Sequence, residues 1–128
     1  MINLNGTITS HEAAKLSLKN RGLLYGDAVF ETIKAVNGQL FFWEDHYFRL
    51  MASMRILRMA IPMHFSMEFL ENEIKKTIRA AAFDKQAVRI KLYVNRKAGG
   101  KYNPTNHDVD YFIELEATGN PFYTLNED

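Results

Sequence analysis

One helix-like segment offers an arginine that could bind an anion. In residues 46–50, which read His-Tyr-Phe-Arg-Leu, Arg49 lies well away from the apolar stripe of that segment at about 100° per residue. Its own helical face continues through small or apolar residues, and a planar guanidinium in such surroundings suits a phosphate or a carboxylate. The same side chain could instead extend into solvent beside Asp45. For His46 we expect a structural role, because no second histidine or carboxylate stands at metal-ligand spacing.

A set of cations gathers later in the chain. Arg89 and Lys91 alternate along one expected strand, and three more bases follow in or near a glycine-rich loop: Arg96, Lys97 and Lys101. A concave basic face of this kind could hold a substrate carboxylate. Alternatively, Glu114 and Glu116 on a neighbouring expected strand could pair with these bases. The residues alone leave both interpretations open.

The segment 20–27, which reads Asn-Arg-Gly-Leu-Leu-Tyr-Gly-Asp, precedes a long expected strand. Its two glycines allow the backbone to approach another group closely. It lacks the Lys-Ser/Thr of a P-loop and the spacing of a dinucleotide-binding fingerprint, so a turn holding a buried Tyr25 is the plainer interpretation. A serine hydrolase is not supported, because the sequence contains no G-x-S-x-G motif.

Two Asn-Gly pairs predict the β-hairpins that would position these groups. Asn5-Gly6 and Asn37-Gly38 both suit a two-residue turn in which each central residue has positive φ. The four arms are residues 2–4, 7–9, 28–36 and 39–43. Both alternating sets of the 28–36 arm contain apolar residues, so we expect both faces of that strand to be covered.

Helical periodicity replaces the strand pattern at Glu44. The first helix should end at about residue 60 or 61, because the residue before Pro62 disfavours helical angles. Ser66 offers an N-cap oxygen to a second helix over residues 67–81. Strand patterns return over 87–94 and 109–116. The order predicts an α+β fold, an antiparallel sheet of about six strands with two helices packed on one face.

Composition narrows the classes of protein that remain. The 128 residues suit one domain, and 47% hydrophobic with 24% charged residues excludes wholesale disorder. A formal net charge of +1 gives no reason to expect nucleic acid as a partner, and the absence of cysteine excludes disulfides, cysteine-ligated zinc and thiol nucleophiles. No apolar run is long enough to span a membrane and no signal peptide is evident, so we expect a cytoplasmic protein.

In their order and spacing, these motifs resemble the class-IV aminotransferase family, the pyridoxal 5'-phosphate (PLP) enzymes of fold type IV. This family includes branched-chain and D-amino-acid aminotransferases and aminodeoxychorismate lyase. The resemblance is to the N-terminal domain of these enzymes and covers essentially the whole chain. It is carried by Asn5-Gly6, Arg21–Glu31, Asn37-Gly38, His46-x-x-Arg49-Leu50 and Arg89–Tyr102.

The resemblance implies roles for particular side chains. Arg49 matches the arginine that grips the phosphate of PLP, and Tyr25 and Phe30 match residues on the substrate side of the cofactor ring. Lys91 and Lys101 look most like the lyase branch, in which basic groups meet the substrate carboxylate. The implied substrate is an amino acid or aminodeoxychorismate. A homodimer is also implied, because the glycine-rich loop of the family often reaches the neighbouring subunit's site.

The sequence departs from the family in lacking its Schiff-base lysine, which belongs to a C-terminal domain. The nine lysines here, from Lys15 to Lys101, do not match that motif. We therefore expect residues 1–117 to form the N-terminal domain and residues 118–128 to begin an interdomain linker. By itself the chain should have no catalytic residue and should hold PLP weakly or not at all. The alternative is a non-catalytic dimerisation or binding module.

Overall fold

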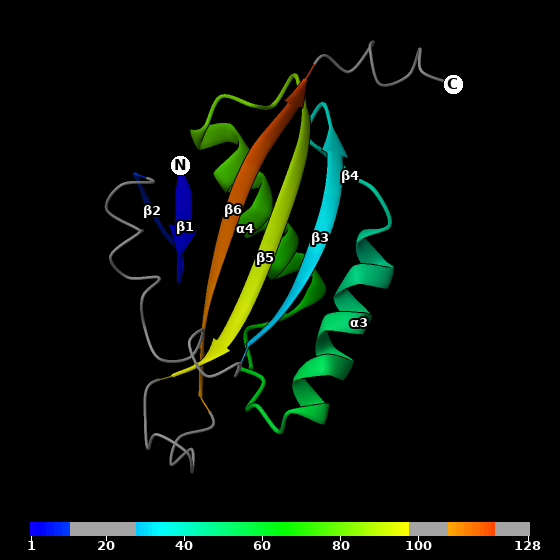
Figure 1. The fold of residues 1–128 in the computed structure, drawn as a ribbon, viewed down its shortest axis with the longest axis vertical. Coiled ribbons are helices and arrows are strands. Elements are labelled where there is room, and N and C mark those ends of the chain that lie inside the picture. Colours follow the sequence, from blue (N-terminus) through cyan, green and yellow to red (C-terminus); the bar gives the residue numbers. More distant parts are fainter. Residues whose placement is uncertain (11–27, 98–107, 120–128) are drawn as a thin grey trace.

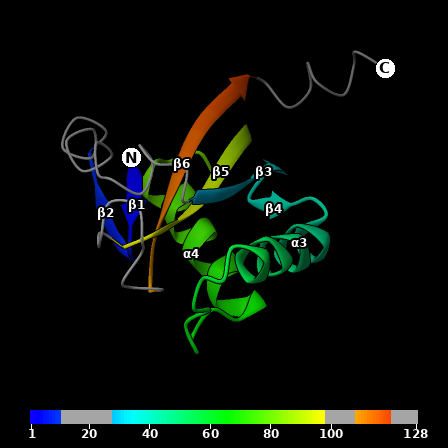
Figure 2. The same cartoon turned by 60° about the horizontal axis from the view of Figure 1, so that its bottom comes forward.

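The computed structural model describes residues 1–10, 28–97 and 108–119. They form the expected α+β fold, with six antiparallel strands in one sheet and two helices on one of its faces (Figures 1 and 2). The elements are β1 (Ile2–Leu4), β2 (Thr7–Thr9), β3 (Ala28–Val36), β4 (Gln39–Leu40), α3 (Trp43–Ile56), α4 (Met67–Ala80), β5 (Ala87–Arg96) and β6 (Val109–Gly119). The strand order is β2-β1-β6-β5-β3-β4. No helix in these ranges is long and apolar enough to cross a membrane.

Both predicted hairpins are confirmed. Asn5 and Gly6 have φ of 52° and 94°, and Asn37 and Gly38 have φ of 52° and 77°, as a type I′ turn requires. The predicted length of the second arm was wrong, since β4 ends at Leu40 rather than at residue 43. The chain leaves the strand there because Phe42, the N-cap of α3, adopts a left-handed conformation with φ of 57°.

The end of the first helix was also predicted wrongly, since α3 stops at Ile56 and not at residue 60 or 61. Arg58 takes φ of 57°, its N–H donates to the Arg55 carbonyl, and the Met59 N–H donates to the Met54 carbonyl. These two bonds form a Schellman motif, which ends the helix before Pro62 can act. Helix α4 begins as predicted, with the Ser66 hydroxyl accepting a bond from the Phe69 N–H.

The core lies between the two helices and the face of the sheet that they cover. Its fully buried side chains include Ile33, Leu50, Met54, Leu70, Ile74, Ile90 and Leu92. In the described part of the chain no helix lies over the opposite face, so the expectation of cover on both faces is not met there (Figure 2). On that face Phe30 is 56% exposed, whereas Tyr93 and Phe112 stack with ring centroids 4.3 Å apart.

A polar network fastens β1 and β6 to α4. Asn3 is fully buried, and its amide donates to Glu73 Oε1 at 3.0 Å and to Thr77 Oγ1 at 3.1 Å. The Tyr111 hydroxyl donates to the same Glu73 oxygen at 3.1 Å. Strand β6 continues through Gly119 and so extends past the domain boundary expected at residue 117.

Candidate functional site

Arg49 of α3 binds a buried carboxylate of β3. Its Nε donates to both oxygens of Glu31 at 3.1 Å, and its Nη2 donates to Glu31 Oε1 at 2.9 Å. The Glu31 side chain is 7% exposed, whereas that of Arg49 is 61% exposed. Glu31 points toward α3 because it alternates with the buried Ile33 and Ala35 on the helix-covered face of β3.

His46, one helical turn before Arg49, supports the same carboxylate. Its Nδ1 lies 2.6 Å from Glu31 Oε1, a separation that two lone pairs would not tolerate, so Nδ1 carries a proton and donates it. Nδ1 then cannot also accept from Arg49 Nη2, which lies 3.2 Å away. The expected structural role of His46 is therefore to hold Glu31.

The charges in this cluster reinforce one another. Burial alone raises the pKa of Glu31, but the hydrogen bonds and charges of Arg49 and His46 outweigh it, and the pKa lies below its ordinary value. The hydrogen bond and charge of Glu31 raise the pKa of Arg49. Both groups are therefore ionised at neutral pH. Arg49 Nη1 makes no hydrogen bond to any residue in the described ranges, and its two N–H donors suit a phosphate oxygen.

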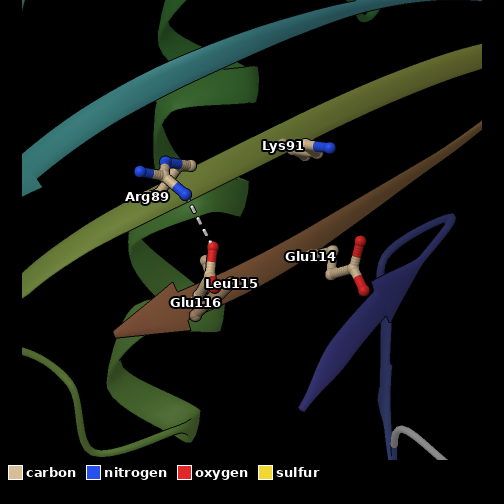
Figure 3. Close-up of a pocket in the computed structure, with 5 residues that line it drawn as sticks. All are labelled: Arg89, Lys91, Glu114, Leu115 and Glu116. Carbon is tan, nitrogen blue, oxygen red and sulfur yellow. Dashed lines mark hydrogen bonds and ion pairs between the residues drawn. The ribbon is translucent and has the colours of Figure 1, made fainter. Parts of the chain in front are cut away.

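Phe30 and Lys91 lie together on the other face of the sheet. The Lys91 ammonium nitrogen lies 6.0 Å from the centroid of the Phe30 ring, which is the outer limit for a cation–π contact. The next cation along β5, Arg89, pairs with Glu116 of β6 at 2.9 Å (Figure 3). Lys91 stands opposite Glu114 in the strand register but forms no ion pair among the residues described.

These side chains border a shallow depression of about 350 Å³ (Figure 3). Its lining consists of Arg89, Lys91, Glu114, Leu115 and Glu116. The two interpretations of the basic strand thus divide between its two cations. Arg89 is neutralised by the neighbouring strand, and Lys91 keeps its charge for a ligand.

The structure does not bring all the predicted site residues into one pocket. Phe30 and Glu31 are adjacent in β3 and point to opposite faces, so Arg49 approaches from the helix side while Lys91 lies on the open side. Tyr25 and Lys101 lie outside the described residues. Within the described ranges, no three histidine, aspartate or glutamate side chains gather as metal ligands would.

Glu31 is the site residue that sequence reasoning missed. The available signal was its position as the charged member of an otherwise apolar alternating set that includes Ile33 and Ala35. A carboxylate on a buried face requires a cationic or donor partner, and the next helix carries His46 and Arg49 at i, i+3 spacing.

Comparisons with known proteins point to one family. The family model for amino-transferase class IV matches residues 28–127. A D-alanine aminotransferase of Listeria monocytogenes is 30% identical over 114 residues, covering 89% of this chain and 37% of that protein. A putative branched-chain-amino-acid aminotransferase of Methanocaldococcus jannaschii is 36% identical over 98 residues, covering 77% of this chain and 33% of that protein.

Solved structures agree with these sequence matches. A branched-chain amino acid aminotransferase of T.th., complexed with N-(5'-phosphopyridoxyl)-L-glutamate, superposes with a TM-score of 0.74 at 30% identity. That match covers 91% of this chain and 40% of the solved chain. The branched-chain aminotransferase of Thermoproteus uzoniensis with norvaline gives a TM-score of 0.76 at 27% identity, with 92% and 40% covered. The chain thus spans about a third of the length of the curated relatives quoted above.

Proposed function

The chain belongs to the class IV aminotransferase family, and we propose that it is the N-terminal part of a PLP-dependent enzyme that transfers the amino group of an amino acid. The observation that carries this proposal is the Arg49 guanidinium. It is fixed on one edge by Glu31 and presents Nη1 to solvent, and so has the chemistry to bind a phosphate monoester.

In this proposal Arg49 binds the phosphate of PLP and anchors the cofactor at the edge of the sheet. Bound PLP supplies an electron sink for bonds at the substrate Cα. The charge of Arg49 offsets part of the charge of the phosphate, and its fork restricts how that group can turn. Glu31 and His46 remain on the protein side of the guanidinium, where they fix its orientation.

Phe30 and Lys91 form the substrate side in the same proposal. Phe30 offers an exposed ring against which an apolar or planar group can pack, and Lys91 attracts a carboxylate beside it. Tyr25 and Lys101 are proposed to join them. The Schiff-base lysine is assigned to a following domain, which the relatives' greater length accommodates.

The proposed substrates are D-alanine or a branched-chain amino acid, the substrates in the names of the relatives. An aminodeoxychorismate lyase is the second candidate. It is favoured by Lys91, which forms no ion pair in the described part of the chain and could bind a second carboxylate. A homodimer and a cytoplasmic location remain parts of the proposal.

The test uses the full-length protein that contains this chain. Titration of the dialysed apoprotein with PLP, followed by visible absorbance, should give a bound spectrum in the wild type and about tenfold weaker binding after Arg49→Ala. Arg55→Ala is the matched control, because Arg55 is an exposed arginine near the end of the same helix. Equal PLP affinity in the two variants would contradict the role of Arg49.

Kinetic measurements then decide the reaction and the substrate. Release of pyruvate and 4-aminobenzoate from aminodeoxychorismate identifies the lyase. Amino transfer from D-alanine or from a branched-chain amino acid identifies the corresponding aminotransferase. A full-length protein that binds no PLP and transfers no amino group would support the alternative of a dimerisation or binding module.

A further inference from the structure

The side chain of Arg49 is held more tightly than its exposure alone would allow. A solvent-exposed arginine normally samples many rotamers, and ordering it costs conformational entropy. Here Nε and Nη2 together donate to the two oxygens of one carboxylate, a bidentate arrangement that fixes the plane of the guanidinium. The edge carrying Nη1 is therefore directed by the contact that the opposite edge makes.

Glu31 is a rigid support for this contact. It belongs to β3, where Ile33 and Ala35 on the same face are buried and the register with β5 runs unbroken from Ala28 to Val36. The proton on His46 Nδ1 binds Glu31 Oε1 at 2.6 Å and restricts the carboxylate further. The sheet therefore fixes the position of Glu31, and Glu31 fixes the position of Arg49.

We propose that Glu31 is a positioning residue for cofactor binding, which holds the Arg49 guanidinium so that Nη1 is presented to the phosphate of PLP. His46 acts one step further back by orienting Glu31. The inference rests on the proposed function, in which Arg49 is the phosphate ligand. Glu31 itself does not touch the phosphate in this arrangement.

A competing explanation makes the opposite prediction about affinity. If Glu31 only cancelled the charge of Arg49, removing its carboxylate charge would make the site more positive and would tighten phosphate binding. If Glu31 positions Arg49, the same substitution frees the guanidinium and weakens phosphate binding in spite of the more favourable net charge. The sign of the change therefore distinguishes positioning from charge cancellation.

The experiment compares two probes on the full-length apoprotein, PLP and pyridoxal, which differ only in the phosphate. Glu31→Gln should weaken PLP binding about tenfold and leave pyridoxal binding unchanged. Glu71→Gln is the matched control, because it removes a carboxylate from an ion pair with Lys75 on α4, away from Arg49. Unchanged or tighter PLP binding by Glu31→Gln would overturn the proposal, and so would an equal loss of pyridoxal binding.

Two further variants keep the test decisive. Glu31→Asp preserves the charge but shortens the reach, so it should also weaken PLP binding, and it replaces Glu31→Gln if that variant does not fold. In an Arg49→Lys background, Glu31→Gln should cost less than about twofold, because the guanidinium on which it acts is gone. Additive losses would overturn the proposal.

The failure of the inference can be distinguished from failure of the proposed function. If Arg49→Lys itself leaves the preference for PLP over pyridoxal unchanged, the proposed phosphate role of Arg49 fails. If Arg49→Lys lowers that preference and both Glu31 variants retain it, only the positioning role of Glu31 fails. Urea unfolding of each apoprotein, followed by circular dichroism, separates loss of affinity from loss of fold.

Discussion

Replacement of Tyr111 by phenylalanine should destabilise the protein through one hydrogen bond. The Tyr111 hydroxyl donates to Glu73 Oε1 at 3.1 Å, and the side chain is 5% exposed. Burial, together with the charge and the hydrogen bond of Glu73, raises the pKa of Tyr111, so the hydroxyl stays protonated as a donor well into the alkaline range. Phenylalanine preserves the ring, which packs edge-on against Phe65 and Phe69.

The size of the effect follows from the partners that Glu73 keeps. A hydrogen bond to a charged group contributes about 1.5–3 kcal/mol. After Tyr111→Phe, Glu73 still accepts from Asn3 at 3.0 Å and pairs with Lys76 at 3.2 Å, so its carboxylate is not left without partners. We therefore expect a loss at the lower end, about 1.5–2 kcal/mol at pH 7.

The pH dependence of this loss tests its cause. Burial raises the pKa of Glu73, but the hydrogen bonds from Asn3, Lys76 and Tyr111 and the charge of Lys76 outweigh it, so the pKa lies below its ordinary value of 4.5. The stability contributed by such a carboxylate is present above about pH 4.5 and is lost as the pH falls through the lower folded-state pKa. The difference between wild type and Tyr111→Phe should therefore narrow below about pH 4.5.

Urea unfolding between about pH 7 and pH 3.5, followed by circular dichroism, measures both quantities. Tyr93→Phe is the matched control, because the Tyr93 hydroxyl has no hydrogen-bond partner within the described ranges, and it should change stability by less than about 0.5 kcal/mol. A Tyr111→Phe variant as stable as the control at neutral pH would refute the assigned energy. A difference that stays constant with pH would refute the role of the Glu73 charge.

Three other substitutions should change the urea midpoint in defined ways. Ile33→Ala removes a fully buried core side chain and should cost about 3 kcal/mol, whereas Ile56→Ala, at an exposed position, should cost less than about 0.5 kcal/mol. Ala82→Gly should stabilise the protein by about 0.5–1 kcal/mol, because Ala82 has φ of 59° at the end of α4; a loss of stability would show that the alanine is not strained. Ser66→Ala removes the N-cap acceptor of the Phe69 N–H and should cost about 1 kcal/mol, and an unchanged midpoint would contradict that role.

Local chemistry was enough to predict the turns and the start of α4. An Asn-Gly pair between strand-like runs has few alternatives to a type I′ turn, and the Ser66 hydroxyl satisfies a backbone donor within its own segment. The helix ends were harder to predict. Arg58 and Ala82 occupy left-handed positions that glycine usually fills, and the residue after each, Met59 or Phe83, packs into the core. Tertiary packing therefore ends these helices against the local preference.

The candidate site shows the same division between local and tertiary information. The helical spacing of His46 and Arg49 could be read from the sequence, but their shared partner could not, because Glu31 lies 15 and 18 residues away on a strand. Without that partner, an exposed arginine and a ligand-binding arginine look alike. The buried carboxylate distinguishes them, since it restricts the guanidinium before any ligand arrives.

Strand β3 relates the two sides of the proposed site through its pleat. Phe30 faces the open side and Glu31 faces the helices, so the substrate side and the phosphate anchor depend on consecutive residues of one strand. The pairs Phe30–Tyr93 and Glu31–Leu92 fix which residue takes which face. A shift of the register by one residue would send the carboxylate away from Arg49 and place the aromatic ring in the core. The pairing of β3 with β5 is therefore as necessary to the site as the charged groups themselves.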